Sequence, residues 1–218
     1  MPIMVGVRDD DAAPGAVDVL PYGDRALLVE VADGAGVAAL AAGLERSPLP
    51  GQQDVVPAAR TVLVRLDRAP AETDAAALRR LARTPAPPAP DLPPVELPVV
   101  FDGPDLAEVA ELTGRAVPAL VEQLVAVEYT VAFSGFAPGF GYLTGLPEEL
   151  HVPRRGTPRT RVPAGSVGLA GPYAGAYPRP SPGGWQLVGR TEAVLFDVER
   201  DEPALLRPGV RVRFRDVG

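Results

Sequence analysis

The chain has 218 residues, of which 46% are hydrophobic and 22% charged, and its net charge at neutral pH is −7. It lacks cysteine and lysine and has one histidine, His151, which excludes disulfides, thiolate nucleophiles, Schiff bases, a P-loop lysine and a zinc site of several imidazoles. The acidic balance argues against nucleic acid and no apolar run approaches the roughly 20 residues that cross a bilayer, so we expect a cytoplasmic protein without nucleic-acid or membrane partners.

The first half of the chain predicts a small α/β domain over residues 17–84. Residues 1–16 are acidic, do not read as a secretory signal, and predict a disordered tail. Beyond them, β-branched runs predict strands and alanine- and leucine-rich runs predict helices. The predicted strands are Val17–Leu20, Ala26–Val31, Asp54–Val56 and Thr61–Leu66, and the predicted helices are Gly36–Glu45 and Thr73–Ala82, the latter capped by Thr73 or Asp74.

The second half predicts a β-barrel or sandwich over residues 95–218, for an α+β protein overall. Seven prolines between Thr84 and Pro98 predict a linker at residues 85–94, because proline neither continues a helix nor donates to a sheet. Dense glycine and proline from Gly135 to Gly189 favours short strands joined by turns. The predicted strands are Val95–Phe101, Tyr129–Phe133, Ser166–Ala170, Trp185–Val188, Ala193–Phe196 and Arg211–Phe214, and the predicted helices are Asp105–Leu112 and Pro118–Val125.

Positive charge is concentrated between Tyr129 and Thr191. This window holds six arginines and two acids, a net charge of +4 in a chain whose total is −7. A cationic surface with exposed backbone suits an anionic small ligand. The window therefore locates the function without naming the reaction.

Four arginines fall within eight residues of this window: Arg154, Arg155, Arg159 and Arg161. Prolines around them favour an extended segment, in which Arg159 and Arg161 share a face. Guanidinium groups on one face can clamp a carboxylate or phosphate, and a solvated basic strand edge fits the pattern equally.

The glycine-rich segments beside the arginines are further candidates. Gly165 and Ser166 suit either an anion-binding nest or a barrel corner. Gln186 follows the single tryptophan, Trp185, and the two would face opposite sides of a strand. The aromatic run from Phe136 to Tyr142 suits either a lip over a pocket or a packed turn.

Together these motifs resemble one family, the B subunit of bacterial ATP-dependent 5-oxoprolinase. The family is also described as allophanate hydrolase subunit 1, and it includes a Kip-type inhibitor of a sporulation histidine kinase. The resemblance covers about residues 17–216 and is carried by FSGFAPGFGYLTGL, PRRGTPRTRVPAGSVGLAG, GAYPRPSPGGWQLVGRT, ALLRPGVRVRF and, upstream, PYGDRALLVEV, DVVPAARTVLVRLD and GPDLAEVAELTG.

The resemblance implies a small amino-terminal α/β domain and a carboxy-terminal cyclophilin-like β-barrel. It also implies a larger partner, the C subunit of 5-oxoprolinase; the two together would act on 5-oxo-L-proline at the expense of ATP, and a separate A subunit would complete ring opening to glutamate. We expect Mg²⁺ to accompany ATP through its phosphates rather than in a dedicated protein cage, and the isolated chain to be inactive.

The family's motifs assign site residues to this chain. Arg159, Arg190 and Ser166 are the implied catalytic residues, and no metal ligand is implied. The implied substrate-binding residues are Arg154, Gln186, Gly165, Phe136 and Tyr142.

The chain departs from the family's common residues at Leu124, Gly141, Tyr173 and Ala174. These departures leave open a different substrate, and the family's kinase inhibitor leaves open a different function, so two alternatives remain. One is an allophanate-hydrolase-like or other ATP-dependent subunit that acts on another amide. The other is a regulatory protein that docks a histidine kinase through its aromatic segment, Phe136–Tyr142.

Overall fold

The computed structural model describes residues 17–84 and 93–218. The chain divides into two compact units, Met1–Pro87 and Pro88–Gly218, each with its own hydrophobic core. The predicted tail, residues 1–16, and most of the predicted linker, residues 85–94, lie outside the described residues.

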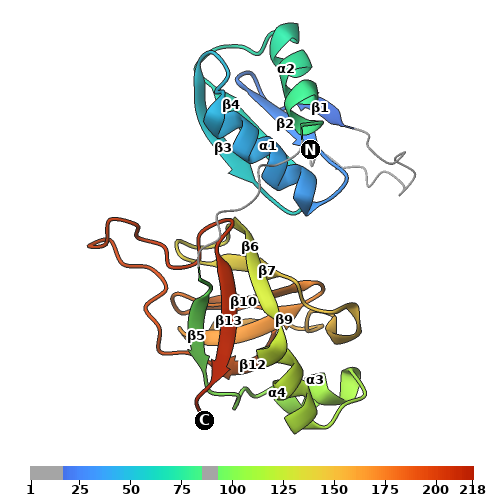
Figure 1. Cartoon of the computed structure of the whole chain (residues 1–218), viewed down its shortest axis with the longest axis vertical. Coiled ribbons are helices and arrows are strands. Elements are labelled where there is room, and N and C mark those ends of the chain that lie inside the picture. The colour runs from blue at the N-terminus through green and yellow to red at the C-terminus, as the bar shows by residue number, and fades with distance from the viewer. Residues whose placement is uncertain (1–16, 85–92) are drawn as a thin grey trace. The chain divides into compact units, whose positions relative to one another are not determined.

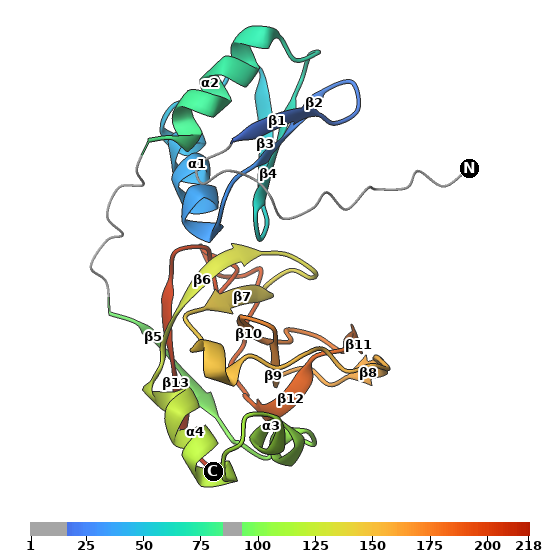
Figure 2. The ribbon, with the colours of Figure 1, turned by 90° about the vertical axis from the view of Figure 1, so that its right-hand side faces the viewer.

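The first unit is an antiparallel sheet with two helices on one of its faces (Figures 1 and 2). Its elements are β1 (Asp18–Pro21), β2 (Ala26–Glu30), α1 (Gly34–Arg46), β3 (Gln52–Pro57), β4 (Thr61–Leu66) and α2 (Glu72–Ala82). The strands lie in the order β1-β2-β4-β3. Val29 pairs with Val62 and Leu27 with Val64, and all four are buried, as expected when alternate residues of each strand face the core.

Helix α2 begins earlier than its sequence predicts. Ala71 is the N-cap residue, so the predicted cap at Thr73 or Asp74 is wrong in position. Asp74 instead lies inside the first turn, where its carboxylate accepts the Ala71 N–H at 2.7 Å and pairs with both Nη atoms of Arg68 at 2.8 and 2.9 Å. The carboxylate reaches back to the cap from the third helical residue, as in half of a capping box.

The second unit is a nearly closed, barrel-like sheet of seven strands (Figure 1). Its main elements are β5 (Val95–Val99), α3 (Leu106–Leu112), α4 (Val117–Ala126), β6 (Glu128–Ser134), β7 (Gly141–Thr144), β9 (Ser166–Ala170), β10 (Tyr173–Ala176), β12 (Gln186–Arg190) and β13 (Arg211–Asp216). The strand order is β12-β9-β10-β7-β6-β13-β5, and the β13–β5 pair is parallel. Val100 and Arg190 exchange backbone hydrogen bonds at 2.9 Å, which joins the two ends of this order.

Additional short elements decorate the barrel. A 3-10 turn spans Glu148–Leu150, and strands β8 (Arg159–Val162) and β11 (Ser181–Gly183) form a separate two-stranded sheet. Helices α3 and α4 lie together at one end of the barrel (Figures 1 and 2). They contact β12 and β13 respectively, and the buried residues Val109, Leu120 and Leu124 join the barrel core.

One predicted strand of the second unit is wrong, and four short strands were not predicted. Residues Ala193–Phe196 form no strand; Phe196 makes a single bridge to Ala204, and buried Leu195 anchors a loop to the core. Leu195 and the partly buried Ala193 hold the loop against the core, whereas Val194 and Phe196 are exposed. The strands that the sequence did not predict, β7, β8, β10 and β11, have three or four residues each.

Candidate functional site

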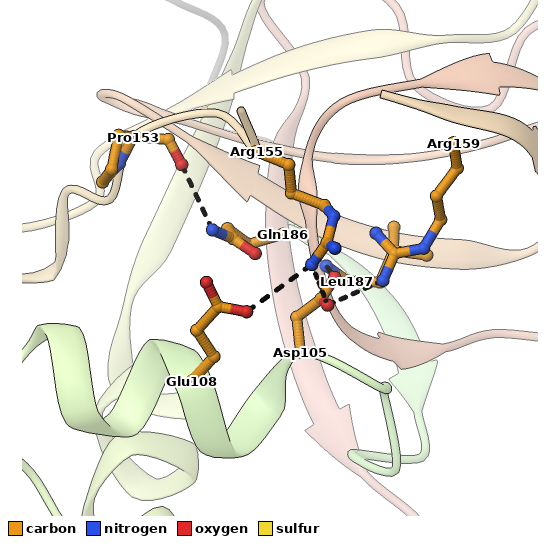
Figure 3. Close-up of polar contacts among 7 residues, drawn as sticks. All are labelled: Asp105, Glu108, Pro153, Arg155, Arg159, Gln186 and Leu187. Atoms are coloured by element: carbon orange, nitrogen blue, oxygen red, sulfur yellow. Dashed lines mark hydrogen bonds and ion pairs between the residues drawn. The ribbon is translucent and has the colours of Figure 1, made fainter. Parts of the chain in front are cut away.

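A buried carboxylate, that of Asp105, is the polar centre of the second unit. Asp105 is 3% exposed. Its Oδ1 accepts hydrogen bonds from Arg155 Nη1 at 2.7 Å and Arg159 Nη2 at 2.6 Å, and its Oδ2 accepts the Leu187 N–H at 2.7 Å (Figure 3). We call Asp105, Arg155, Arg159 and Gln186 the Asp105 cluster.

The loop that carries Asp105 is fixed against strand β12. The Asp105 N–H donates to Leu187 O at 3.0 Å, and the Gly103 N–H donates to Val188 O at 3.2 Å. A Cβ at Gly103 would lie 2.3 Å from Leu187 O, so only glycine permits this approach. Asp105 occupies the N-cap position of α3 but makes no capping bond; its side chain turns to the arginines instead.

The two arginines come from the segment that leads into β8. Arg159 is the first residue of that strand, and the Arg155 N–H is held by Gly184 O at 2.8 Å. Their side chains are 24% and 30% exposed. Glu108, 53% exposed, lies 3.5 Å from Arg155 Nη1 and offsets part of the remaining positive charge.

The arginines determine the ionisation of Asp105. Burial alone would raise the pKa of the Asp105 carboxyl. The hydrogen bond from Arg159, the Leu187 N–H and the charges of Arg159 and Arg155 outweigh burial and hold this pKa below its ordinary value. Asp105 is therefore an anion at neutral pH.

Gln186 completes the cluster from strand β12. It is 2% exposed, and its Nε2 donates to Pro153 O at a long 3.5 Å. Among the residues that the structure describes, the buried side-chain atoms without a hydrogen-bond partner are Arg155 Nε, Arg159 Nη1 and Gln186 Oε1. All three belong to the Asp105 cluster.

The three arginines singled out by the family motifs have different surroundings. Arg159 joins Asp105, whereas Arg190 Nε pairs with Asp102 at 2.9 Å, with both side chains about half exposed. Arg154 is exposed. Burial raises the pKa of the Tyr177 hydroxyl, and the positive charge of Arg154 offsets part of this rise. The structure thus groups Arg159 with Arg155 around Asp105. Arg190 has a different partner, Asp102, which lies three residues before Asp105 in the chain.

Gly165 and Ser166 form a tight corner of the barrel. Gly165 has φ +78°, and a Cβ there would lie 2.2 Å from Thr191 O. Its N–H donates to Tyr177 O, and Ser166 pairs with Arg190 across β9 and β12. Ser166 is 6% exposed. A cavity of about 310 Å³ opens beside this corner, lined in part by Gly165, Tyr177 and Thr191.

Phe136 and Tyr142 belong to a group of packed rings. Tyr142 stacks on Phe133 with centroids 4.4 Å apart, and Trp185, 5% exposed, meets the edges of Phe140 and Tyr142. Phe136 is 56% exposed and has φ +62°, a left-handed conformation that non-glycine residues rarely adopt. Most of this segment is packed turn, and among its aromatic rings Phe136 is the exposed one.

The four positions that depart from the family lie in packed parts of the second unit. Leu124 and Ala174 are fully buried in the barrel core. A Cβ at Gly141 would lie 2.9 Å from Leu206 Cβ, so a larger residue there requires the neighbouring loop to move. Tyr173 joins the ring group through Phe133 and Tyr142.

The remaining sequence features have no place in the Asp105 cluster. The single histidine, His151, has its Nε2 3.0 Å from Leu146 O. In the described ranges, 17–84 and 93–218, no group of three or more histidine, aspartate or glutamate residues is placed to hold a metal ion. No helix within those ranges has the length and apolar character needed to span a membrane.

Sequence reasoning did not identify Asp105 and chose Arg154 rather than its neighbour Arg155. Asp105 was predicted only as the first residue of a helix, and nothing in the local pattern indicated its contact with residues 50 and 54 positions away. The arginine run itself, residues 154–161, contains no acid, and this was the available signal, since buried guanidinium groups require an anion from elsewhere.

Comparison with known proteins relates the chain to carboxyltransferase domains and to 5-oxoprolinase. The family model of the carboxyltransferase domain, subdomain C and D, matches residues 17–206. The 5-oxoprolinase B subunit of Escherichia coli O157:H7 is 58% identical over 123 residues, which are 55% of this chain and 56% of the relative. The chain therefore spans about half the length of the curated relatives it matches.

Solved structures share the fold. TTHA0988 is 38% identical with a TM-score of 0.74, and the match covers 89% of this chain and 40% of that chain. The urea amidolyase of K. lactis is 22% identical with a TM-score of 0.73, covering 92% of this chain and 15% of that chain, which is a likeness of fold alone.

Proposed function

Because this chain belongs to the family of the carboxyltransferase domain, subdomain C and D, we propose that it is the B subunit of a cytoplasmic 5-oxoprolinase. Curated relatives that carry this name, 44–58% identical over 123 residues, support the proposal. Its substrate would be 5-oxo-L-proline, its product L-glutamate, and its partner the larger C subunit of that enzyme. The A subunit would complete ring opening.

The observation that carries the proposal is the arginine pair on Asp105. Arg155 and Arg159 are both held by one buried carboxylate oxygen, and each retains a covered N–H without a partner. Guanidinium groups fixed in this way suit an anionic substrate, because their orientation is set before the substrate arrives. 5-Oxoproline carries such a charge on its carboxylate.

The chemistry requires positive charge more than a covalent nucleophile. A lactam carbonyl is a poor electrophile, and ATP, when bound, would supply the phosphoryl group that turns its oxygen into a leaving group. In our proposal Arg159 binds the carboxylate of the substrate and so holds the lactam in place, while Asp105 fixes the orientation of Arg159. Arg154 and Arg190 are further candidates for phosphate oxygens, which guanidinium donors fit, and Mg²⁺ would enter with the phosphates.

In this proposal the remaining candidate residues shape the surroundings of the arginines. Ser166 and Gly165 shape the corner beside Arg190, and Phe136 and Tyr142 contribute to the ring group. We propose that the site is composite, with ATP held jointly by this chain and the C subunit, so that the isolated chain is inactive.

The proposal is tested by mixing the purified chain with the C subunit of its own enzyme and measuring ADP release as 5-oxo-L-proline is added. We expect ATP hydrolysis that depends on both the lactam and the partner. An intact complex that releases no ADP in response to 5-oxoproline contradicts the proposal.

A second candidate function is an ATP-dependent reaction on another amide, such as a urea-derived acid. The unpartnered atoms of the Asp105 cluster favour an anionic amide in general. They fit an oxygen acceptor and an N–H donor, and neither group requires that the amide be part of a ring. Replacing 5-oxoproline by linear amide acids in the same assay separates the two candidates.

A further inference from the structure

Three covered polar atoms without partners belong to residues of the Asp105 cluster. Arg155 Nε and Arg159 Nη1 are donors, and Gln186 Oε1 is an acceptor. Buried polar groups are nearly always hydrogen-bonded, so three exceptions in one described cluster indicate a guest. That guest must supply two acceptors and one donor.

We propose that these three atoms bind the carboxylate and the adjacent N–H of an N-acylated α-amino acid. The carboxylate oxygens would accept from Arg155 Nε and Arg159 Nη1, and the N–H would donate to Gln186 Oε1. For its ligand the inference rests on the proposed function, since 5-oxoproline is a cyclic member of this class. It adds which atoms of the protein bind which group of the ligand.

The orientation of the Gln186 amide follows from its neighbour. Pro153 O is only an acceptor, so Gln186 must turn its Nε2 toward it, at 3.5 Å. The Oε1 then points into the cluster, and Figure 3 shows the Arg155 guanidinium between the Gln186 amide and the Arg159 guanidinium. Gln186 therefore presents an acceptor to any guest in the cluster.

Charge favours a carboxylate as the guest's oxygen group. Within the cluster two guanidinium groups face one buried carboxylate, and Glu108 is more than half exposed at the rim. A second carboxylate would balance the two arginines. Asp105 engages Arg155 Nη1 and Arg159 Nη2, which leaves Arg155 Nε and Arg159 Nη1 for the guest. A fully ionised phosphate offers acceptors but no N–H for Gln186.

The segment 153–158, which carries Arg155, has no regular secondary structure. A single backbone bond, from the Arg155 N–H to Gly184 O, ties Arg155 down, and the Arg155 and Arg159 side chains are already partly exposed. In this proposal the guest approaches from the exposed side of these two side chains, so that Arg155 stays on Asp105 and the barrel strands stay in place.

Calorimetric titration of the full chain, alone and with its larger partner, tests the assignment. The probes are 5-oxo-L-proline, its N-methyl derivative, which lacks the N–H, and 2-pyrrolidone, which lacks the carboxylate. We expect about tenfold weaker binding of the N-methyl derivative, the effect of one hydrogen bond, and at least hundredfold weaker binding of 2-pyrrolidone.

The decisive variant is Gln186→Met, which keeps the side-chain length and removes the acceptor. We expect its affinity for 5-oxoproline to fall about tenfold while its affinity for the N-methyl derivative stays unchanged, so that the ratio of the two approaches one. The matched control is Gln123→Met, at an exposed glutamine that binds Arg115, where the tenfold ratio should remain. If Gln186→Met does not fold, Arg159→Lys should weaken both ligands together and preserve the ratio.

The outcomes separate this inference from the proposed function. Lactam-dependent ATP hydrolysis together with equal binding of 5-oxoproline and its N-methyl derivative overturns the site assignment alone, as does a tenfold ratio that persists in Gln186→Met. Failure of all probes to bind also overturns it. If 5-oxoproline gives no ATP hydrolysis but N-acetylglycine binds with the same dependence on Gln186, the proposed function is wrong and the site stands.

Discussion

Arg159 and Asp105 are 54 positions apart in the sequence, yet Arg159 Nη2 lies 2.6 Å from Asp105 Oδ1. The contact joins the start of β8 to the loop before α3. Asp105 is almost fully buried, so its ion pair with Arg159 is shielded from water and holds the Arg159 side chain in one orientation. An exposed ion pair would contribute little to such a fixed orientation.

Removing the carboxylate should destabilise the second unit. We expect Asp105→Ala to lower the free energy of unfolding by about 3 kcal/mol, because it leaves two partly buried guanidinium groups without their anion. Urea denaturation of both proteins at pH 7 measures the difference. A loss below about 0.5 kcal/mol would mean that the arginines find other partners.

The same carboxylate makes stability depend on pH. The pKa of Asp105 is lower in the folded protein than its ordinary value of about 3.9, so its contribution is fully present above about pH 5 and is lost as pH falls through the folded pKa. The difference in unfolding free energy between the wild type and Asp105→Asn should therefore shrink between pH 5 and pH 3. A constant difference over this range would contradict the ion-pair account.

Replacing Arg159, which pairs with Asp105, should have a large effect on activity, whereas replacing Arg190, which pairs with Asp102, should have a small effect on stability. Arg159→Ala should lower lactam-dependent ATP hydrolysis by the assembled enzyme at least a hundredfold, because it removes a fixed positive charge from the proposed site. Arg190→Ala should change stability by less than about 1 kcal/mol, since its pair with Asp102 is half exposed. Full activity of Arg159→Ala in a folded complex would remove Arg159 from the mechanism.

Gly103 should tolerate no side chain. We expect Gly103→Ala to destabilise the protein by about 2–4 kcal/mol, because its Cβ would lie 2.3 Å from Leu187 O and push the Asp105 loop off β12. Gly156→Ala is the matched control, because a Cβ there meets nothing within 4 Å. Thermal unfolding of the two variants gives the comparison, and equal midpoints would show that the loop can shift freely.

The sequence predicted those parts of the fold that depend on local pattern. Both helices of the first unit and its four strands follow from alternation and helical spacing, with ends shifted by one or two residues. The short strands β8 and β11 pair with each other and carry few apolar residues, so no periodicity marks them.

The site was predicted only in part, because it is made by long-range contacts. The arginine run stood out by composition, and Gln186 stood out by its motif. The anion that the two arginines share, Asp105, precedes helices α3 and α4 in the chain, whereas the arginines follow them. The pairing of a positive segment with one remote carboxylate follows from the barrel's closure at Val100 and Arg190, which brings β5 and β12 together. Local patterns do not encode that closure.

Trp185 gives the chain a built-in optical probe. It is the single tryptophan, it is 5% exposed, and it lies immediately before Gln186, the first residue of β12. Its indole emission therefore reports on one place in the molecule, and a guest bound beside Gln186 would alter the wavelength and intensity of that emission without any attached dye.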